Sequence, residues 1–224
     1  QLCGATEKDC GMDRGLTLCD VTILKNGAPL LSLSRHIGPG EVLSVMGPSG
    51  VGKSTLLAFI TGTLAQDFSA TGTIILDGMD VTDAPAYQRR VGILFQDDLL
   101  FPHLSVGANL AFGLRAGGSK VDRQTRIDEA LAEVGLDGFA DRDPATLSGG
   151  QKARVALMRM LLSDPCGLLL DEPFSRLDTA LRAQVRELVF ARAKARALPV
   201  LMVTHDAEDA AAAGGDIVTL SPLH

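Results

Sequence analysis

Short apolar runs recur along the chain and alternate with segments in which apolar residues follow helical spacing. Contiguous or alternating apolar residues predict β-strands, and apolar residues three or four positions apart predict amphipathic helices. On this basis the sequence predicts strands over residues 16–25, 30–34, 42–46, 72–76, 91–95, 168–170, 199–203 and 217–220. Helices are predicted over 56–60 and 121–134, from 151 to 162, after Asp178 and in the alanine-rich run after 206.

The order of these elements predicts an α/β protein. Asn26-Gly27, a dipeptide typical of a tight turn, joins the first two strands, so we expect an antiparallel opening. The later strands alternate with helices, which is typical of a mostly parallel sheet with functional residues at the carboxyl ends of its strands. The residues that follow such ends are Gly47, Gln96, Asp171 and His205.

Length and charge narrow the class of protein. A chain of 224 residues suffices for one substantial α/β domain with a full core. The net charge of −6 argues against binding of a nucleic-acid backbone as the main activity. No apolar run reaches the roughly 18–20 residues that span a bilayer. The cysteines have no C-x-x-C spacing, which favours reduced thiols, with a disulfide between Cys3 and Cys10 as the alternative.

One stretch carries a specific chemical motif, a G-x-x-x-x-G-K-S loop between a predicted strand and a predicted helix. Its glycines let successive N–H groups point at phosphate oxygens, and the helix N-terminus adds a partial positive charge. We expect Lys53 to reach the β- and γ-phosphates of a nucleotide and the Ser54 hydroxyl to bind Mg²⁺. The predicted nucleotide-binding residues are Gly47, Pro48, Ser49, Gly50, Val51, Gly52, Lys53, Ser54 and Thr55.

Four further pieces follow this loop in order: Gln96, Leu147-Ser148-Gly149-Gly150-Gln151, Leu168-Leu169-Leu170-Asp171-Glu172-Pro173 and His205. With these pieces, residues 16–220 resemble the ATP-binding-cassette (ABC) ATPases, the motor subunits of ABC transporters. The resemblance implies a P-loop NTPase core with a mostly parallel sheet, an N-terminal antiparallel β subdomain and an inserted α-helical signature subdomain at about residues 97–160. We expect residues 1–15 to be a flexible extension and residues 16–224 to be a single ABC ATPase domain that uses ATP and Mg²⁺.

The resemblance also implies roles for the residues at the strand ends. Asp171 would hold Mg²⁺ through water, and Glu172 would be the general base for the attacking water. Gln96 would bind Mg²⁺ and sense the γ-phosphate. His205 would contact the γ-phosphate and position the water or Glu172. Taken singly, each of these side chains could instead cap a turn, face solvent or form an ordinary hydrogen bond.

The signature segment implies a second ATPase subunit. Ser148, Gly149, Gly150 and Gln151 begin a helix whose N–H groups suit an anion, and in the family they meet the γ-phosphate of ATP held by the partner. Asp178 resembles the loop that crosses this dimer seam, and it is also a candidate helix N-cap. The expected assembly is a head-to-tail dimer, most simply a homodimer, around two ATP molecules.

The segment over 92–106 is similar to that of importers for thiamine, ferric iron and polyamines. This similarity favours an ATPase that works at the cytoplasmic face of the membrane, with transmembrane permease subunits, a solute-binding protein and no nucleic acid. The apolar loop after Gln96 would receive a coupling helix from the permease. The alternative is a lipoprotein-release or cell-division type ATPase, which imports no solute. A ribosome- or DNA-directed cassette and a non-hydrolysing subunit fit less well, because the chain is acidic and contains Glu172 and His205.

One departure from the family concerns the base of the nucleotide. The family usually places an aromatic residue near Leu24–Asn26 that stacks on adenine, whereas residues 23–27 are Ile-Leu-Lys-Asn-Gly. We therefore expect weak selectivity between ATP and GTP.

Overall fold

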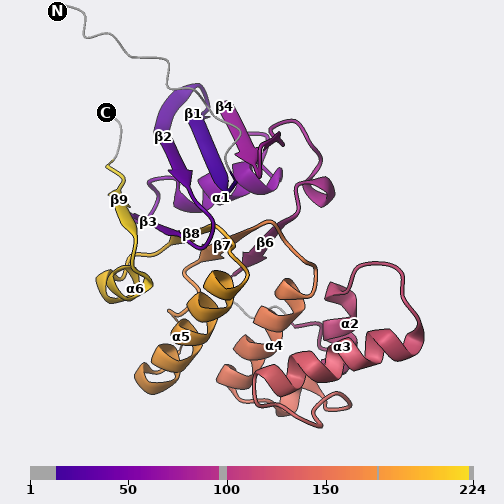
Figure 1. Ribbon diagram of the computed structural model, residues 1–224. Helices are drawn as coiled ribbons and strands as arrows, with labels where there is room; N and C mark the ends of the chain where they lie inside the picture. Colours follow the sequence, from indigo (N-terminus) through magenta and orange to yellow (C-terminus); the bar gives the residue numbers. More distant parts are fainter. Residues whose placement is uncertain (1–13, 96–99, 176, 222–224) are drawn as a thin grey trace, which may run out of the picture.

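The computed structural model of the chain describes residues 14–95, 100–175 and 177–221 (Figure 1). The extension predicted over 1–15 thus lies almost wholly outside the described residues, and so does Gln96. The described part contains two sheets with helices packed around them, which confirms the α/β class.

The chain opens with an antiparallel sheet, as predicted. Its strands are β1 (Leu16–Lys25), β2 (Ala28–Ile37), β4 (Phe68–Leu76) and β5 (Met79–Asp80), in the order β2-β1-β4-β5. Asn26 and Gly27 both have positive φ between β1 and β2, a conformation that these two residue types tolerate best.

Strand β4 begins at Phe68 and not at Gly72, where the sequence pattern predicts its start. Gly72 has a φ of +99°, and a Cβ at this position would lie 2.6 Å from the Val21 Cα. The pairing of β1 with β4 also shifts register here, between Cys19 and Thr22. The extra residue of this β-bulge lies in β1, where Asp20 and Val21 oppose Gly72. Gly72 therefore lies inside a longer strand and does not begin it.

The second sheet is parallel and has the order β6-β7-β8-β3-β9. Its strands are β6 (Val91–Leu94), β7 (Gly167–Asp171), β8 (Val200–Val203), β3 (Val42–Met46) and β9 (Asp216–Thr219), and every neighbouring pair is parallel. Leu168 and Leu170 pack into one apolar cluster and Leu169 into the other, so both faces of β7 are buried. This double burial explains the unbroken leucine run.

The helices cover the two faces of this sheet unequally (Figure 1). Helix α1 (Lys53–Thr61) shares an apolar cluster with the antiparallel strands. The other cluster contains residues from α2 (Val106–Gly113), α3 (Lys120–Glu133), α4 (Gly149–Leu161) and α5 (Thr179–Ala195). Helix α6 (Ala207–Ala213) and short 3₁₀ turns at Ala86–Gln88 and Pro144–Thr146 complete the described elements. The subdomain boundaries at about 97–160 stay a prediction.

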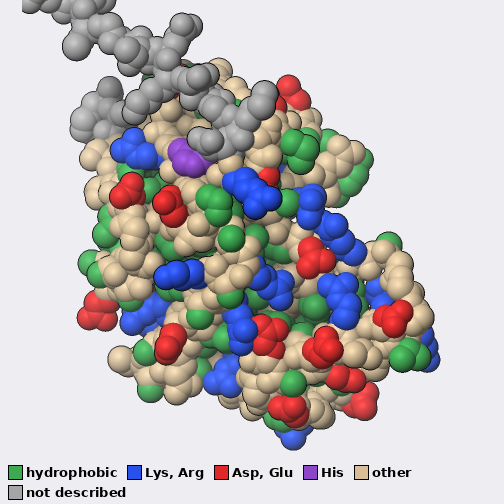
Figure 2. Space-filling model, viewed as in Figure 1, with side chains coloured by type: hydrophobic (Ala, Val, Ile, Leu, Met, Phe, Trp, Pro, Cys, Tyr) green, Lys and Arg blue, Asp and Glu red, His purple; other side chains and the backbone are tan. Residues whose placement is uncertain are grey.

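Two surface findings complete the description. Lys and Arg side chains are interspersed with Asp and Glu over the face that Figure 2 shows. Within the described residues, no helix combines the length and apolar character that crossing a membrane requires.

The thiols depart from the expectation at one position. Cys19 is disulfide-bonded, so the prediction of reduced thiols is wrong there. Cys166, after α4, is a free thiol.

Candidate functional site

The predicted phosphate loop lies between the carboxyl end of β3 and the N-terminus of α1. Its backbone needs glycine at two places for different reasons. Gly50 has a φ of +82° and open space where a Cβ would be, whereas a Cβ on Gly52 (φ +98°) would lie 2.9 Å from Leu30 and 2.8 Å from Leu31. Gly50 therefore leaves the loop open to a ligand, and Gly52 lets β2 pack closely against the start of α1.

Lys53 is the first residue of α1 and is only 8% exposed. Its Nζ donates hydrogen bonds to the carbonyl oxygens of Gly47, at 2.7 Å, and Pro48, at 3.1 Å. These carbonyls hold the ammonium group across the loop, next to the open N–H groups of the helix start. The loop thus presents a fixed positive charge and the positive end of a helix dipole to the same space.

Ser54 and Asp171 meet beneath the loop. The Ser54 Oγ donates a hydrogen bond to Asp171 Oδ1 at 3.4 Å, which joins α1 to the carboxyl end of β7. Burial raises the pKa of Asp171 and the neighbouring Glu172 adds to this, while the Ser54 hydrogen bond and the Lys53 charge oppose it. One hydroxyl and one carboxylate side by side are the hard oxygen donors that Mg²⁺ prefers, so these residues fit the predicted metal.

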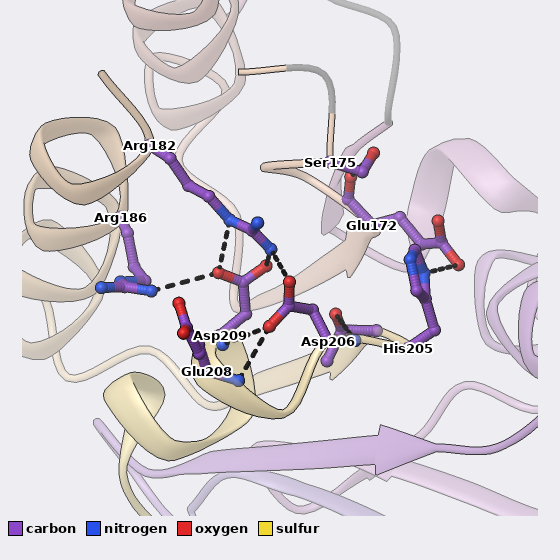
Figure 3. Close-up of polar contacts among 9 residues, drawn as sticks. Glu172, Ser175, Arg182, Arg186, His205, Asp206, Glu208 and Asp209 are labelled. Atoms are coloured by element: carbon purple, nitrogen blue, oxygen red, sulfur yellow. Dashed lines mark hydrogen bonds and ion pairs between the residues drawn. The ribbon is translucent and has the colours of Figure 1, made fainter. Parts of the chain in front are cut away.

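Glu172 and His205 come from neighbouring strands and point toward one another (Figure 3). The Glu172 Oε1 lies 3.0 Å from the His205 Nδ1, with the carboxylate side chain 24% exposed and the imidazole 63% exposed. Glu172 has a φ of +47°, and its N–H donates to the Val203 carbonyl of β8 at 2.9 Å. This turn directs the two adjacent carboxylates to different partners, Asp171 to Ser54 and Glu172 to His205.

An ion-pair cluster holds the segment that follows His205 (Figure 3). Asp206 caps α6 by accepting from the backbone N–H groups of Glu208 and Asp209. Arg182 of α5 donates to both Asp206 and Asp209, and Arg186 donates to Asp209 at 3.2 Å. Asp209 is only 2% exposed, so this cluster fixes the α6 start against α5. Sequence reasoning did not identify this cluster, because its members lie on different helices.

A cavity of about 330 Å³ connects several of these groups. Residues of the phosphate loop and Glu172 form one part of its wall, and the antiparallel sheet forms the other. It is lined by Lys25, Leu30, Ser49, Gly50, Gly52, Lys53, Ser54, Thr55, Phe68 and Glu172. Its open glycine, its fixed ammonium group and its volume fit a nucleotide, with phosphates at the loop. The contribution of Lys25, Leu30 and Phe68 is not apparent from the motif.

The signature segment and Asp178 are not among the residues that line this cavity. Ser148 caps α4 by accepting from the Gln151 N–H, and the Gln151 Oε1 accepts from the Ser148 N–H. Gly150 packs so tightly that a Cβ would lie 2.2 Å from Leu181, while Gly149 faces open space. The Asp178 Oδ1 accepts from the Leu181 N–H at 3.1 Å and so caps α5. The predicted capping role of Asp178 is confirmed, and its seam role stays a prediction.

Comparison with known proteins agrees with this geometry. A family model described as ABC transporter matches residues 30–175. The chain is 49% identical over 180 residues, covering 80% of this chain and 83% of the relative, to the uncharacterized ABC transporter ATP-binding protein YnjD of Escherichia coli (strain K12). It is 45% identical to the thiamine import ATP-binding protein ThiQ of Jannaschia sp. (strain CCS1), over 84% of this chain and 81% of the relative. It is 44% identical to the taurine import ATP-binding protein TauB of Pseudomonas savastanoi pv. phaseolicola, over 87% of this chain and 73% of the relative.

Proposed function

The chain belongs to the ABC transporter family, and on that premise we propose that it hydrolyses ATP in the cavity between the Gly47–Thr55 loop and Glu172 to drive solute import. The observation that carries this proposal is the contact between Glu172 and His205. Glu172 lines the cavity that also contains Lys53, and the His205 imidazole contacts the Glu172 carboxylate.

The residues of the chain divide the work between binding and proton transfer. The loop N–H groups and Lys53 bind the phosphates and compensate their charge. Ser54 and Asp171 would hold Mg²⁺, which would supply positive charge against the phosphate oxygens. Glu172 accepts the proton of the attacking water, and His205 orients the Glu172 carboxylate through its Nδ1. Gln96, outside the described residues, is proposed as a further Mg²⁺ ligand that senses the γ-phosphate.

A second copy of the chain completes the site. The open N-terminus of α4, with Ser148 and Gly149, suits an anion but does not line the cavity of its own chain. We assign it, with Gly150, Gln151 and Asp178, to the ATP bound by a partner in a head-to-tail homodimer. Such a dimer would carry two ATP molecules at its seam.

Membrane permease subunits are the other partners that the family implies. Phe95 and Phe112 are 43% and 69% exposed and line a groove of about 260 Å³ between β6, α2 and α4. Phe101, after the Gln96 loop, packs edge-on against Phe112 at 4.7 Å. We propose that a permease segment docks at this apolar surface, that the ATPase lies at the cytoplasmic face, and that a solute-binding protein delivers the solute.

The names of the relatives favour an importer over a lipoprotein-release or cell-division ATPase. Because relatives named for thiamine import and taurine import match at nearly equal identity, we propose a small organic solute of this kind, of the thiamine type.

The loop assignment is tested by the variant Lys53→Ala. Removal of a charge-assisted contact costs about 1.5–3 kcal/mol, so we expect ATP affinity to fall by roughly one to two decades. Calorimetric titration with Mg·ATP measures this change, and Lys120→Ala, at the exposed start of α3 and outside the cavity, is the matched control. Equal ATP affinity of Lys53→Ala and the parent would reject the phosphate-loop assignment.

A further inference from the structure

Lys25 and Phe68 form the last residue pair of the ladder between β1 and β4. Directly paired residues of antiparallel strands project from the same face of the sheet. Two positions earlier on β1, Ile23 is fully buried against α1 and its neighbours, and it pairs with Ala70. The core-facing side of the sheet therefore continues past the core to Lys25 and Phe68, where it lines the cavity next to the phosphate loop.

Backbone contacts fix this end of the sheet. The Asn26 N–H donates to the Asp67 carbonyl at 3.0 Å, and the Phe68 N–H donates to the Ala65 carbonyl at 3.0 Å. The Lys25 Nζ lies 5.8 Å from the centroid of the Phe68 ring. The ring is half-buried, and the lysine side chain is exposed. The pair is thus a positioned aromatic ring with a cationic donor beside it.

We propose that Phe68 and Lys25 form the base-binding end of the cavity, and that this pair accepts guanine as readily as adenine. The inference rests on the proposed function, because it assumes that the phosphates of a nucleotide lie at the Lys53 loop. Every purine offers a flat face that can stack on the Phe68 ring. Sequence reasoning missed this ring because Phe68 precedes the predicted start of its strand.

The cavity should not discriminate between guanine and adenine because of the side chains that the antiparallel sheet contributes to it. Among the described lining residues, the antiparallel strands supply one ammonium donor, Lys25, and two apolar groups, Leu30 and Phe68. Guanine presents the acceptors O6 and N7 to such a donor, and adenine of a free nucleotide presents N7 and N1, so either base can accept a hydrogen bond from Lys25. These three side chains include no acceptor that would select the exocyclic amino group of adenine.

The test is calorimetric titration of the full chain with Mg·ATP, Mg·GTP and Mg·tripolyphosphate. The variants are Phe68→Leu, which keeps apolar bulk without the ring, Phe68→Trp, which keeps a stacking face, and Lys25→Ala. Tyr87→Ala is the control, because Tyr87 is an exposed aromatic residue (82%) that does not line the cavity.

We expect the parent to bind ATP and GTP within tenfold of each other. Loss of one stacking contact corresponds to about 5- to 150-fold in affinity, so Phe68→Leu should weaken both nucleotides by at least fivefold. Phe68→Trp should restore them, and tripolyphosphate affinity should not change. Lys25→Ala should weaken ATP and GTP to a similar extent.

Parent affinity for both nucleotides in Phe68→Leu, or a hundredfold preference of the parent for ATP, would overturn the inference. If the parent and Phe68→Leu bind ATP equally while Lys53→Ala does not bind it, the base-binding pair is wrong and the phosphate loop is retained. If the parent binds neither nucleotide nor tripolyphosphate, both the inference and the proposed function fail.

Discussion

Asp171 and Glu172 are adjacent in sequence but occupy different chemical environments. Asp171 is partly buried beside Ser54, and burial raises its pKa. Glu172 lies at the cavity wall and is paired with the exposed His205. A positive φ at Glu172 separates the two side chains, at a backbone cost of order 1–3 kcal/mol. Strain of this kind is typical of functional sites, and under the proposed function it would allow Asp171 to hold a metal and Glu172 to act as a base.

The raised pKa of Asp171 predicts that Asp171→Asn stabilises the nucleotide-free protein at neutral pH. A raised folded-state pKa means that the ionised carboxyl opposes folding above the unfolded-state value of about 3.9. Asparagine removes this cost and keeps a hydrogen-bond acceptor for Ser54. Thermal unfolding from pH 3 to 8 should therefore show a higher Tm for the variant at pH 7 and a difference that vanishes below about pH 4. A lower Tm of the variant at pH 7 would show that the Asp171 charge stabilises the fold.

At this scale, sequence motifs identified individual residues wherever the chemistry requires a fixed spacing. The loop motif and the family resemblance predicted Lys53, Ser54, Asp171, Glu172 and His205, and the structure brings all five into one region, while their roles stay predictions. Phe68 was not found, because its relation to Lys25 depends on the register of two strands, and Gly72, which lies opposite the β1 bulge, interrupts the apolar pattern of β4.

Helices α5 and α6 are joined by charge pairs as well as by apolar contacts. Arg182 and Arg186 project from α5 to Asp206 and Asp209 at the start of α6 (Figure 3). The hydrogen bonds to Asp209 and Asp206 raise the pKa of Arg182 further above its normal range, so this guanidinium is always charged. Because His205 directly precedes Asp206, the cluster also fixes the segment that carries the imidazole. Arg182 is therefore a positioning residue in this account.

Replacement of Arg182 by leucine should lower both stability and turnover. Loss of charge-assisted hydrogen bonds to the buried Asp209 should cost about 1.5–3 kcal/mol in urea denaturation at pH 7. Arg126→Leu is the matched control, because its 3.5 Å pair with Asp164 is about half exposed and should contribute under about 1 kcal/mol. The kcat for ATP hydrolysis should fall with little change in KM, since the ATP-binding loop is untouched.

The stabilisation that Asp206 contributes to the fold should be lost at low pH. Burial raises the pKa of Asp206, but hydrogen bonds from Arg182 and from the backbone of Glu208 and Asp209 outweigh it, and the net pKa is lowered. The stabilisation from Asp206 is therefore present above its unfolded-state pKa of about 3.9 and is lost as the pH falls through its folded-state pKa. The penalty of Arg182→Leu should shrink over that acidic range. A penalty that is equal at pH 3 and pH 7 would remove Asp206 from the cluster.

Elements with strong apolar periodicity were predictable, and short irregular ones were not. The spans of β1, β3 and α3 agree with their predicted ranges to within a residue at each end. Helix α2 was not predicted, because its eight residues contain two glycines and lack an amphipathic pattern; only its first residue, Val106, fell within the predicted apolar loop. Two kinds of hydrogen bond hold its start. The Val106 and Gly107 N–H groups donate to the distant carbonyls of Arg142 and Ala140, and the buried Asn109 side chain hydrogen-bonds the preceding backbone at Phe101, Leu104 and Ser105.

In the whole molecule, the residues of the proposed ATP site lie at two separate places. The loop, Asp171, Glu172 and His205 lie at the carboxyl edge of the parallel sheet, whereas Ser148 begins α4 among the helices on its other face. Two copies arranged head to tail would bring the α4 start of each to the cavity of the other. This arrangement accounts for an open, glycine-flanked helix start that is exposed in the single chain.

ATP that is bound but not cleaved should therefore hold two chains together. In a Glu172→Gln background, we expect light scattering to show a shift from monomer to dimer when Mg·ATP is added, because a ligand that binds only the dimer stabilises it by mass action. A further Ser148→Glu change should reverse the shift by charge repulsion. Ser119→Glu is the control, since Ser119 caps α3 with the same reciprocal hydrogen bonds as Ser148. Reversal by both changes alike would attribute the effect to lost capping.

The rate of ATP hydrolysis by Glu172→Gln at saturating Mg·ATP tests the central claim most directly. Glutamine keeps the shape and hydrogen-bonding capacity of the side chain but cannot accept the proton of water. The account predicts a fall of about 10²–10⁴ in rate, with ATP affinity within a few-fold of the parent. Hydrolysis at the parent rate would contradict it, because Glu172 would then not be the base and the cavity would not be the catalytic site described here.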